Sequence, residues 1–186
     1  MVISSITGQC SVLIERDGEQ YFEKAENIDI LKWLPVTTGK MIKNNNIEIN
    51  DVETIILSSG PGYYTGTRLG ITFAKGIACG SNAPPIVYLD SLEVLADSVE
   101  EEGLIVPLLR ARKNEFHYSV FSRKEGELKR LSGNSIIKKD GLKHIRAYVL
   151  GEGLNYCREF LENASVIEKL YCDAYDLRNY YMRNMA

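Results

Sequence analysis

A glycine-rich segment between a predicted strand and a predicted helix limits the possible folds more than any other feature of the chain. Residues 58–70 read SSGPGYYTGTRLG. The apolar run Thr54–Ser58 before the glycines predicts a buried strand, and Thr65–Gly80 after them has the apolar spacing of a helix. The segment therefore indicates an α/β protein with a tight turn between strand and helix.

The glycines in this turn allow two different uses. They can let backbone N–H groups and a helix N-terminus approach an anion, or they can permit positive φ angles and close packing of the helix. The spacing matches neither the P-loop nor the dinucleotide-binding motif, so both interpretations remain open. The candidate nucleotide or anion loop consists of Gly60, Pro61, Gly62, Thr65 and Gly66.

Three β-prone runs precede the glycine-rich segment and predict three antiparallel strands. They are Val2–Ile6, Cys10–Glu15 and Gln20–Lys24. The pair Asp17-Gly18 favours a tight hairpin turn between the last two. Residues Ile28–Ile42 keep helical apolar spacing and predict a helix of about four turns, in which Pro35 lies in the first turn or produces a kink because it has no N–H. Ile86–Leu89 predicts a further strand after the second helix.

The second half of the chain repeats this order in a shortened form. The predicted elements are the strands Leu104–Leu109, Glu115–Ser122, Glu127–Leu131 and Ala147–Leu150, a turn at Glu125-Gly126 and a helix at Leu154–Leu161. Sequence identity between the halves is negligible, so the repeat rests on element order. We expect two stacked α/β units, residues 1–102 and a smaller unit 103–186, divided at the acidic patch Glu100–Glu102, with the last helix able to pack back on the first unit.

Composition and charge restrict the function classes. The 22 basic and 25 acidic residues give a net charge of −3, so the chain has no overall positive field that would attract nucleic acid. Four distant cysteines, Cys10, Cys79, Cys157 and Cys172, form no CxxC cluster and are expected to be buried, reduced thiols. No basic leader pattern begins the chain and no run approaches the roughly 20 apolar residues of a membrane helix, so we expect a cytoplasmic protein with no membrane contact.

The histidines do not predict a metal site. His117 and His144 lie far apart in the sequence and belong to no HxxxH or HExxH pair. A stretch of the second half could form a basic and aromatic surface for RNA, or simply a strand with one solvated face. Its residues are Arg110, Arg112, Lys113, Lys124, Lys129 and Arg130, interleaved with Phe116, Tyr118 and Phe121.

Two rows of side chains run along the predicted helix Thr65–Gly80. Leu69, Phe73 and Ile77 recur every fourth residue, and the small residues Gly66, Gly70, Ala74 and Ala78 form a row beside them. Such a helix can pack on two sides, although an ordinary core helix needs only one apolar row.

The glycine-rich segment closely resembles the GPGSFTGLRIG signature of the TsaB/YeaZ family, with Tyr63, Tyr64, Thr67 and Leu69 as substitutions. Flanking stretches match in order: CSV at Cys10–Val12, AKGIA at Ala74–Ala78 against AKGLA, and DSLEVLA at Asp90–Ala96 against SSLEALA. Weaker matches are Arg110–Arg112 against DAR and Tyr181–Arg183 against YLR. The resemblance covers most of residues 1–122.

This resemblance implies the actin-like and sugar-kinase-like ATPase fold, built from two tandem ribonuclease-H-like units. It also implies a subunit without catalytic residues or a cofactor of its own, which pairs with a TsaD-type paralogue and a TsaE-type ATPase that hold the metal and ATP. Together they would transfer threonylcarbamoyl to adenosine 37 of tRNA, which this chain would meet only through the complex. The implied partner face comprises Ile28, Leu31, Leu34, Gly66, Leu69, Gly70, Phe73, Ala74 and Ile77. Because such a face is apolar, we expect homodimers of the isolated chain.

Departures from the family pattern support a non-catalytic subunit. Ser4 stands where many family members have an Asp, and a hydroxyl is a poor ligand for a hard cation and a poor general base. Asn27 stands where the family often has a His. Three alternatives remain. The first is an ATPase acting alone, which would bind phosphates at the Gly60–Gly62 turn and manage a metal with a carboxylate such as Asp90. The second is a glycoprotease-like peptidase, for which Ser58 and Ser59 have no histidine partner at the level of a motif. The third is a module that binds a different partner.

Overall fold

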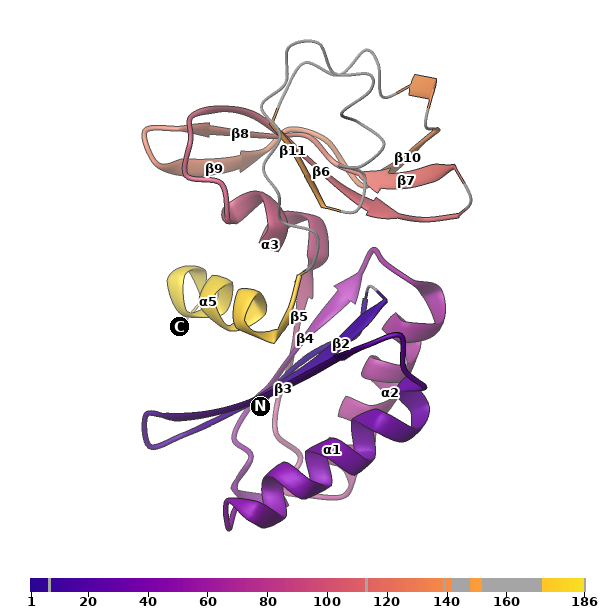
Figure 1. Cartoon of the computed structure of the whole chain (residues 1–186). Coiled ribbons are helices and arrows are strands. Elements are labelled where there is room, and N and C mark those ends of the chain that lie inside the picture. Colours follow the sequence, from indigo (N-terminus) through magenta and orange to yellow (C-terminus); the bar gives the residue numbers. More distant parts are fainter. Residues whose placement is uncertain (7, 113, 139, 142–147, 152–171, 186) are drawn as a thin grey trace. The chain divides into compact units, whose positions relative to one another are not determined.

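The computed structural model describes residues 1–6, 8–112, 114–138, 140–141, 148–151 and 172–185. These residues form two compact units, Met1–Leu89 with Asp173–Ala186, and Asp90–Cys172 (Figure 1). The division falls earlier than residue 102, because the helix α3 (Ser91–Asp97) packs on strands of the second unit. The predicted helix Leu154–Leu161 lies outside the described residues.

A five-stranded sheet organises the first unit. Its strands are β1 (Val2–Ser4), β2 (Gln9–Arg16), β3 (Glu19–Glu26), β4 (Ile55–Gly60) and β5 (Ile86–Asp90), in the order β3-β2-β1-β4-β5. β2 pairs antiparallel with β1 and β3, whereas β4 is parallel to β1. The predicted hairpin is confirmed, because Asp17 and Gly18 both have positive φ angles, 52° and 82°, at the β2–β3 turn.

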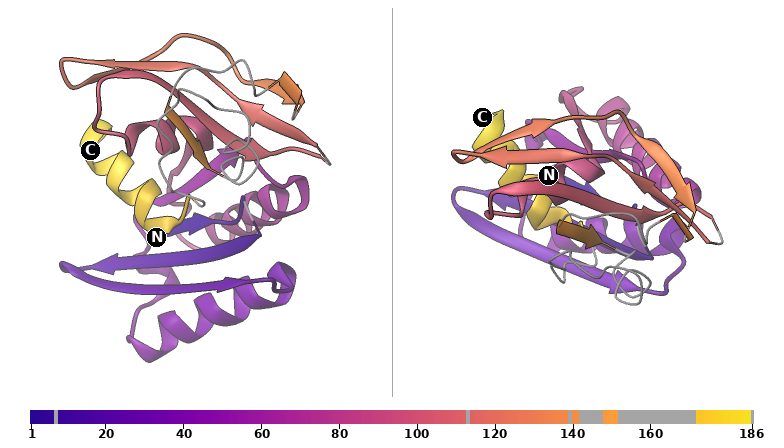
Figure 2. Two further views of the ribbon diagram at one scale, coloured as in Figure 1. Left: turned by 45° about the horizontal axis from the view of Figure 1, so that its top comes forward. Right: turned by 90° about the horizontal axis from the view of Figure 1, so that it is seen from above.

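Helices cover both faces of this sheet. α1 (Ile30–Asn44) and α2 (Tyr64–Cys79) lie on one face, and α5 (Ala174–Asn184) lies on the other (Figure 2). Ile3, Val12 and Leu57 from the sheet pack with Leu34 and Met41 of α1 and Ala74 of α2 in one buried cluster. On the opposite face, the N-terminus of α5 is held by its cap Asp173 and by a hydrogen bond from the Ala174 N–H to the Ser11 hydroxyl, 2.9 Å.

α1 begins after Asp29, whose side chain accepts a hydrogen bond from the Leu31 N–H at 3.1 Å. Pro35 is the sixth residue of the helix, so the prediction that it could lie in the first turn is wrong. Because Pro35 has no N–H, the Leu31 carbonyl has no donor four residues further on. The packing of Leu34 and Met41 in the core offsets this loss, since most helical stability in proteins comes from tertiary packing.

The second unit contains α3 and a six-stranded sheet. The strands are β6 (Gly103–Arg110), β7 (Glu115–Tyr118), β8 (Phe121–Lys124), β9 (Glu127–Arg130), β10 (Ser135–Lys138) and β11 (Tyr148–Gly151). The single strand predicted at Glu115–Ser122 is wrong in one respect, since it divides into β7 and β8. Both nevertheless keep one antiparallel register against β6, with Leu108 opposite Tyr118 and Ile105 opposite Phe121.

The break between β7 and β8 has a local cause. The Ser119 hydroxyl donates to the Ser132 carbonyl at 2.6 Å, and the Val120 N–H donates to the Ser132 hydroxyl at 2.9 Å. These bonds hold the connection between β9 and β10 against the break. The strands that pair with β7 and β8 are therefore also two short strands, with β9 beside β8 and β10 beside β7. β11 pairs parallel with β6.

The described cysteines differ from the expectation at one position. Cys10 and Cys172 are buried free thiols, but Cys79 at the end of α2 is exposed, because it lies on the helix face turned away from the sheet. Cys157 lies outside the described residues. Within the part of the chain that the structure describes, no helix is long and apolar enough to cross a membrane.

Candidate functional site

The glycine-rich turn is packed against the end of β1. Gly60 has a φ angle of 103°, which favours glycine, and it precedes Pro61 through a cis peptide bond. The Tyr63 N–H donates to the Ile6 carbonyl at 2.6 Å. A Cβ atom on Gly62 would lie 2.5 Å from that carbonyl oxygen and 2.7 Å from the Ile6 Cβ. Gly62 is therefore required by a close approach of two backbone segments.

The row of small residues on α2 continues the same contact. A Cβ atom on Gly66 would overlap the Ser5 carbonyl oxygen, and one on Gly70 would overlap the Ser5 hydroxyl. The Ser5 hydroxyl donates to the Gly66 carbonyl at 2.9 Å. Ala74, one turn further on, is fully buried. The predicted assignment of Gly66, Gly70 and Ala74 to a partner face is therefore corrected, because all three face the sheet of their own unit.

Close packing accounts for most of the glycine signature. The Thr67 N–H and hydroxyl both donate to the Tyr63 carbonyl, at 2.9 and 3.0 Å, so they stabilise the first turn of α2. Thr65 is exposed beside this turn. The anion loop stays a prediction, since the geometry explains Gly60, Gly62 and Gly66 without a ligand.

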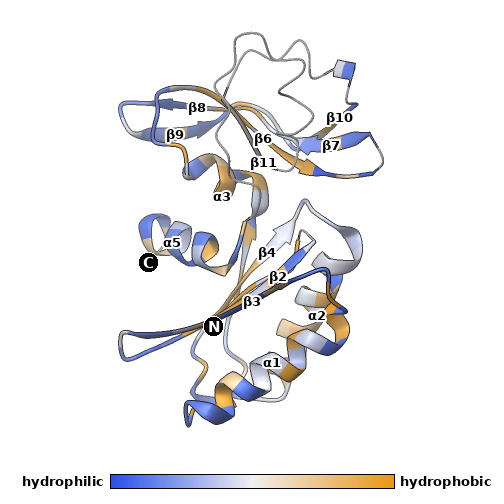
Figure 3. Cartoon of the chain, in the orientation of Figure 1, coloured by the Kyte–Doolittle hydropathy of each residue, from blue (hydrophilic) through white to orange (hydrophobic). Residues whose placement is uncertain are grey.

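The second row on α2 borders an open groove. A groove of about 180 Å³ lies between α1 and α2. Its lining is Ile30, Leu31, Leu34 and Pro35 of α1 and Leu69, Thr72 and Phe73 of α2. Six of these seven side chains are apolar, and apolar bands recur along both helices (Figure 3). Leu31 is 65% exposed, and its significance lies in the apolar side chains beside it, because a single exposed leucine is common on protein surfaces.

The structure divides the remaining predicted interface residues into two groups. Leu31, Leu34, Leu69 and Phe73 line the groove, with Leu34 as its buried floor at 1% exposure. Ile28 and Ile77 are partly buried and pack against the core cluster instead. Sequence analysis missed Ile30, Pro35 and Thr72 as lining residues. The signal for Pro35 was its position one turn after Leu31 on the same helix, since residues four apart share a face.

Charged side chains adjoin lining residues on both helices, and Thr72 is the one polar side chain among the seven that line the groove. At one end Lys32 forms an exposed ion pair with Asp29 at 3.9 Å. Near the start of α2, the Arg68 guanidinium lies 3.9 Å from the ring centroid of Tyr64, which is itself 68% exposed. An apolar centre with a polar rim is typical of a protein-binding surface.

The residues that the alternative functions would need are already engaged. The Asp90 carboxylate accepts hydrogen bonds from the first N–H groups of α3, at 2.9 and 3.1 Å, and forms an ion pair with Arg130 at 3.1 Å. The Ser58 hydroxyl accepts from the Gly60 N–H at 3.2 Å, and the Ser59 hydroxyl donates to the Leu89 carbonyl at 3.1 Å. Ser4 is buried at 2% exposure.

The basic and aromatic surface proposed for RNA does not form as predicted. Phe116 and Phe121 are buried, at 2% and 0% exposure, because they face the core of the second unit and cannot stack on bases. Arg130 lies over the Phe121 ring at 4.6 Å and pairs with Glu93 at 2.9 Å. Arg112 is exposed, and Lys113 lies outside the described residues.

Titratable groups give no sign of a metal centre in the described chain. Among residues 1–6, 8–112, 114–138 and the shorter described segments, no group of three His, Cys, Asp or Glu could hold a metal ion. Burial lowers the pKa of His117, and nearby Glu115 partly opposes this shift. His144 lies outside the described residues.

Comparisons with known proteins agree on one family. Residues 29–154 match the model of TsaD, tRNA N6-adenosine threonylcarbamoyltransferase. The chain is 28% identical over 129 residues to the tRNA threonylcarbamoyladenosine biosynthesis protein TsaB of Haemophilus influenzae, covering 67% of this chain and 54% of that protein. It is 37% identical over 82 residues to TsaB of Bacillus subtilis, covering 44% and 35% of the two chains. The chain thus spans about half the length of the curated relatives it matches.

A solved structure has a similar fold. YeaZ from Pseudomonas aeruginosa superposes with a TM-score of 0.76 at 18% identity, covering 98% of this chain and 91% of that one. This likeness supports a mixed α/β fold with two sheets, in agreement with the strand pairings. Since the TsaD model matches more than half of the residues and the curated relatives are TsaB proteins, the chain belongs to the TsaD family, in its TsaB/YeaZ branch.

Proposed function

We propose that this chain is a required, non-catalytic subunit of the machinery that makes threonylcarbamoyladenosine on tRNA. It acts by pairing with a TsaD-type paralogue, which a TsaE-type ATPase joins. The partner subunits hold ATP and the metal, and adenosine 37 of tRNA is reached only through the complex. The TsaB relatives are named as proteins of threonylcarbamoyladenosine biosynthesis, which supports this role.

The groove between α1 and α2 is the observation that carries the proposal. An exposed apolar patch with polar groups beside it commonly marks a protein-binding site. Leu31, at 65% exposure, stands at the edge of a groove whose floor is the buried Leu34. An α-helix of the partner would fill such a groove with its apolar face. When no partner is present, a second copy of the chain can cover the same face, so we expect homodimers.

Strand order supports the finer expectation of two tandem ribonuclease-H-like units. In the first unit three antiparallel strands are followed by a strand parallel to β1. In the second unit β6, the β7/β8 pair and the β9/β10 pair are again antiparallel, and β11 is parallel to β6. The repeated order fits an actin-like fold whose second unit is reduced.

The contacts of Asp90, Ser58 and Ser59 argue against an ATPase acting alone and against a peptidase. An ATPase acting alone would need a carboxylate such as Asp90 for a metal, yet the Asp90 carboxylate caps α3 and pairs with Arg130. A peptidase would need a free serine nucleophile beside a base. Both serine hydroxyls instead make hydrogen bonds to the backbone of their own unit.

The test is co-purification with the TsaD-type paralogue of the same organism, followed by measurement of threonylcarbamoyl transfer to tRNA. We expect stable pairing and loss of the modification when the chain is left out. The variant Leu31→Glu should weaken pairing at least about tenfold, since it places a charge at the edge of the apolar groove. It should leave the fold intact, because Leu31 is mostly exposed.

The matched control is Val36→Glu on the same helix. Val36 is 54% exposed but does not line the groove, so this variant should pair like the wild type. Equal pairing by both folded variants would refute the groove as the interface. If the chain alone hydrolysed ATP and did not pair at all, the subunit role itself would be wrong.

A further inference from the structure

A second pocket lies at the end of the five-stranded sheet that is opposite the glycine-rich turn. It has a volume of about 700 Å³ and surrounds the start of β1 and of β4. Its lining is Met1, Ile14, Glu15, Arg16, Asp17, Ile47, Asn50, Asp51, Val52, Glu53, Thr54 and Met182. None of these residues lines the groove between α1 and α2. The size falls in the range of roughly 300 to 1,000 Å³ that is usual for ligand sites.

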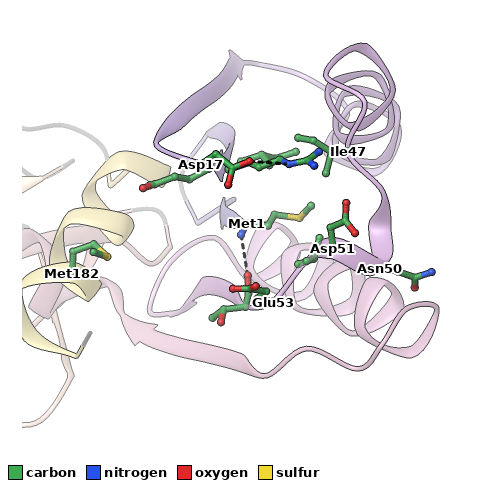
Figure 4. A pocket seen from close by; sticks show the side chains of 12 residues that line it. Met1, Asp17, Ile47, Asn50, Asp51, Glu53 and Met182 are labelled. Atoms are coloured by element: carbon green, nitrogen blue, oxygen red, sulfur yellow. Dashed lines mark hydrogen bonds and ion pairs between the residues drawn. The ribbon is translucent and has the colours of Figure 1, made fainter.

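Apolar side chains form one part of the pocket wall, beside its polar groups, and two of them are adaptable methionines. Ile14, Ile47 and Val52 are buried, at 3%, 7% and 8% exposure. Met182 reaches the pocket from α5 and is 50% exposed. Figure 4 shows Met1 centrally in the pocket and Met182 across from it. Because methionine side chains are flexible and polarisable, they can adjust to apolar groups of different shape.

The rim of the pocket carries excess negative charge. Glu15, Asp17, Asp51 and Glu53 contribute four carboxylates, against one guanidinium from Arg16. Figure 4 shows Asp17, Asp51 and Glu53 around Met1.

The positive groups near the pocket do not neutralise the negative charge of its rim. Arg16 is already engaged, since it pairs with Asp17 at 3.5 Å and donates to the Asn46 carbonyl at 3.0 Å. The Met1 amine donates to the Thr54 carbonyl at 2.9 Å, and burial lowers its pKa to about 6, partly opposed by Glu15, so that it is mostly uncharged at neutral pH. Arg178, outside the lining, pairs with Glu15 at 2.8 Å. Asp51 accepts a hydrogen bond from the Glu48 N–H at 3.3 Å, but within the described residues neither Asp51 nor Glu53 forms an ion pair, so both carboxylates are open to a cation.

We propose that this pocket docks a basic segment of a protein partner. An Arg or Lys of that segment lies against Glu53 and Asp51, and a neighbouring apolar side chain enters between Met1 and Met182. The charge of the rim selects the basic segment, and the apolar part of the wall, with Met1 and Met182, distinguishes that segment from a free small cation. This site is separate from the groove and does not depend on the proposed pairing through α1 and α2.

The probe is a fluorescent peptide in which arginine and leucine alternate, titrated against the full chain and followed by anisotropy. Binding should weaken several-fold as salt rises from about 0.05 M to about 0.5 M, because the Debye length shortens. Met182→Lys should weaken binding about tenfold, since it places a positive charge in the pocket. Glu53→Gln should weaken binding about threefold, because it removes a rim charge that no ion pair within the described chain engages.

The control is Met185→Lys, which adds the same charge near the end of the same helix, where Met185 is 55% exposed and outside the pocket lining. It should bind the probe like the wild type, and equal losses for both methionine variants would overturn the proposal. Equal binding of a peptide with glutamate in place of arginine, or no binding of the basic peptide, would also overturn it. If spermidine bound as tightly as the peptide, the proposed protein segment would be wrong and the ligand would be a small polyamine.

Discussion

Alanine substitutions along α2 should separate glycines that are packed against β1 from a glycine that is not. Gly66 faces the Ser5 backbone carbonyl and Gly70 faces the Ser5 hydroxyl, whereas a Cβ added to Gly76 would meet no atom within 4 Å outside its own neighbourhood. An alanine in a helix gains up to about 1 kcal/mol over glycine when nothing obstructs it. We therefore expect Gly76→Ala to stabilise the protein by about 0.5 to 1 kcal/mol.

Gly66→Ala should have the opposite effect, because the obstructing atom belongs to the backbone and cannot rotate away. Overpacking of this kind costs about 3 kcal/mol, which exceeds the helix gain. For a chain of this length a net loss of about 2 to 3 kcal/mol lowers the melting temperature by roughly 5 to 10 °C. Circular dichroism during thermal unfolding measures the difference. A Gly66→Ala variant as stable as Gly76→Ala would refute the packing argument.

Gly70→Ala gives a sharper version of the same test. Its added methyl group displaces the Ser5 hydroxyl and so breaks the hydrogen bond to the Gly66 carbonyl, at a cost of about 1 kcal/mol. With Ser5→Ala in place, the nearest atom is the Ser5 Cβ at 3.6 Å, an ordinary contact. The two substitutions should therefore be strongly non-additive, and the double variant should be no less stable than Ser5→Ala alone. Additive losses would contradict this geometry.

Three further outcomes can be measured on the isolated chain. The pKa of Glu15 is lowered, and the side-chain hydrogen bond from Arg178 is the largest cause. The variant Arg178→Gln should therefore be less stable than the wild type at pH 7, and this difference should disappear as pH falls through the folded-state pKa of Glu15. Thermal unfolding of both proteins from pH 7 to pH 3 tests this sign. Asp90→Ala should cost about 1 to 2 kcal/mol in urea unfolding, because α3 loses its N-cap. Burial raises the pKa of Cys10 to about 12, so peptide mapping after brief alkylation should find exposed Cys79 modified and Cys10 unmodified; equal labelling would contradict the buried position.

Sequence patterns predicted those elements that depend on local chemistry. The β2–β3 hairpin follows from Asp17-Gly18, since both residues adopt the positive φ angles that such a turn requires. α2 follows from apolar spacing and ends within a residue of its predicted limits. In contrast, β10 (Ser135–Lys138) was missed because it is short, mostly exposed and held as an edge strand by pairing with β7.

The periodicity of the sequence also predicted two rows of side chains on α2, but it did not predict which part of the protein each row contacts. A repeat of four residues fixes which side chains share a helix face, whereas tertiary packing decides what that face touches. The small row meets Ser5 at the end of β1, and the larger row with Leu69 and Phe73 meets α1. The sequence left the position of Pro35 within the helix open for the same reason, since its tolerance inside α1 depends on packing of the helix in the core.

The connection between the outer strand and the parallel strand differs in length between the two units. In that unit the connection from β3 to β4 contains α1, a helix of 15 residues that forms one wall of the groove and whose C-terminal connection supplies Ile47 to the acidic pocket. In the second unit β10 ends at Lys138 and β11 begins at Tyr148, so nine residues make the corresponding connection. This connection has fewer residues than α1 alone. A repeat of strand order therefore does not by itself repeat the 15-residue helix that forms one wall of the groove in the first unit.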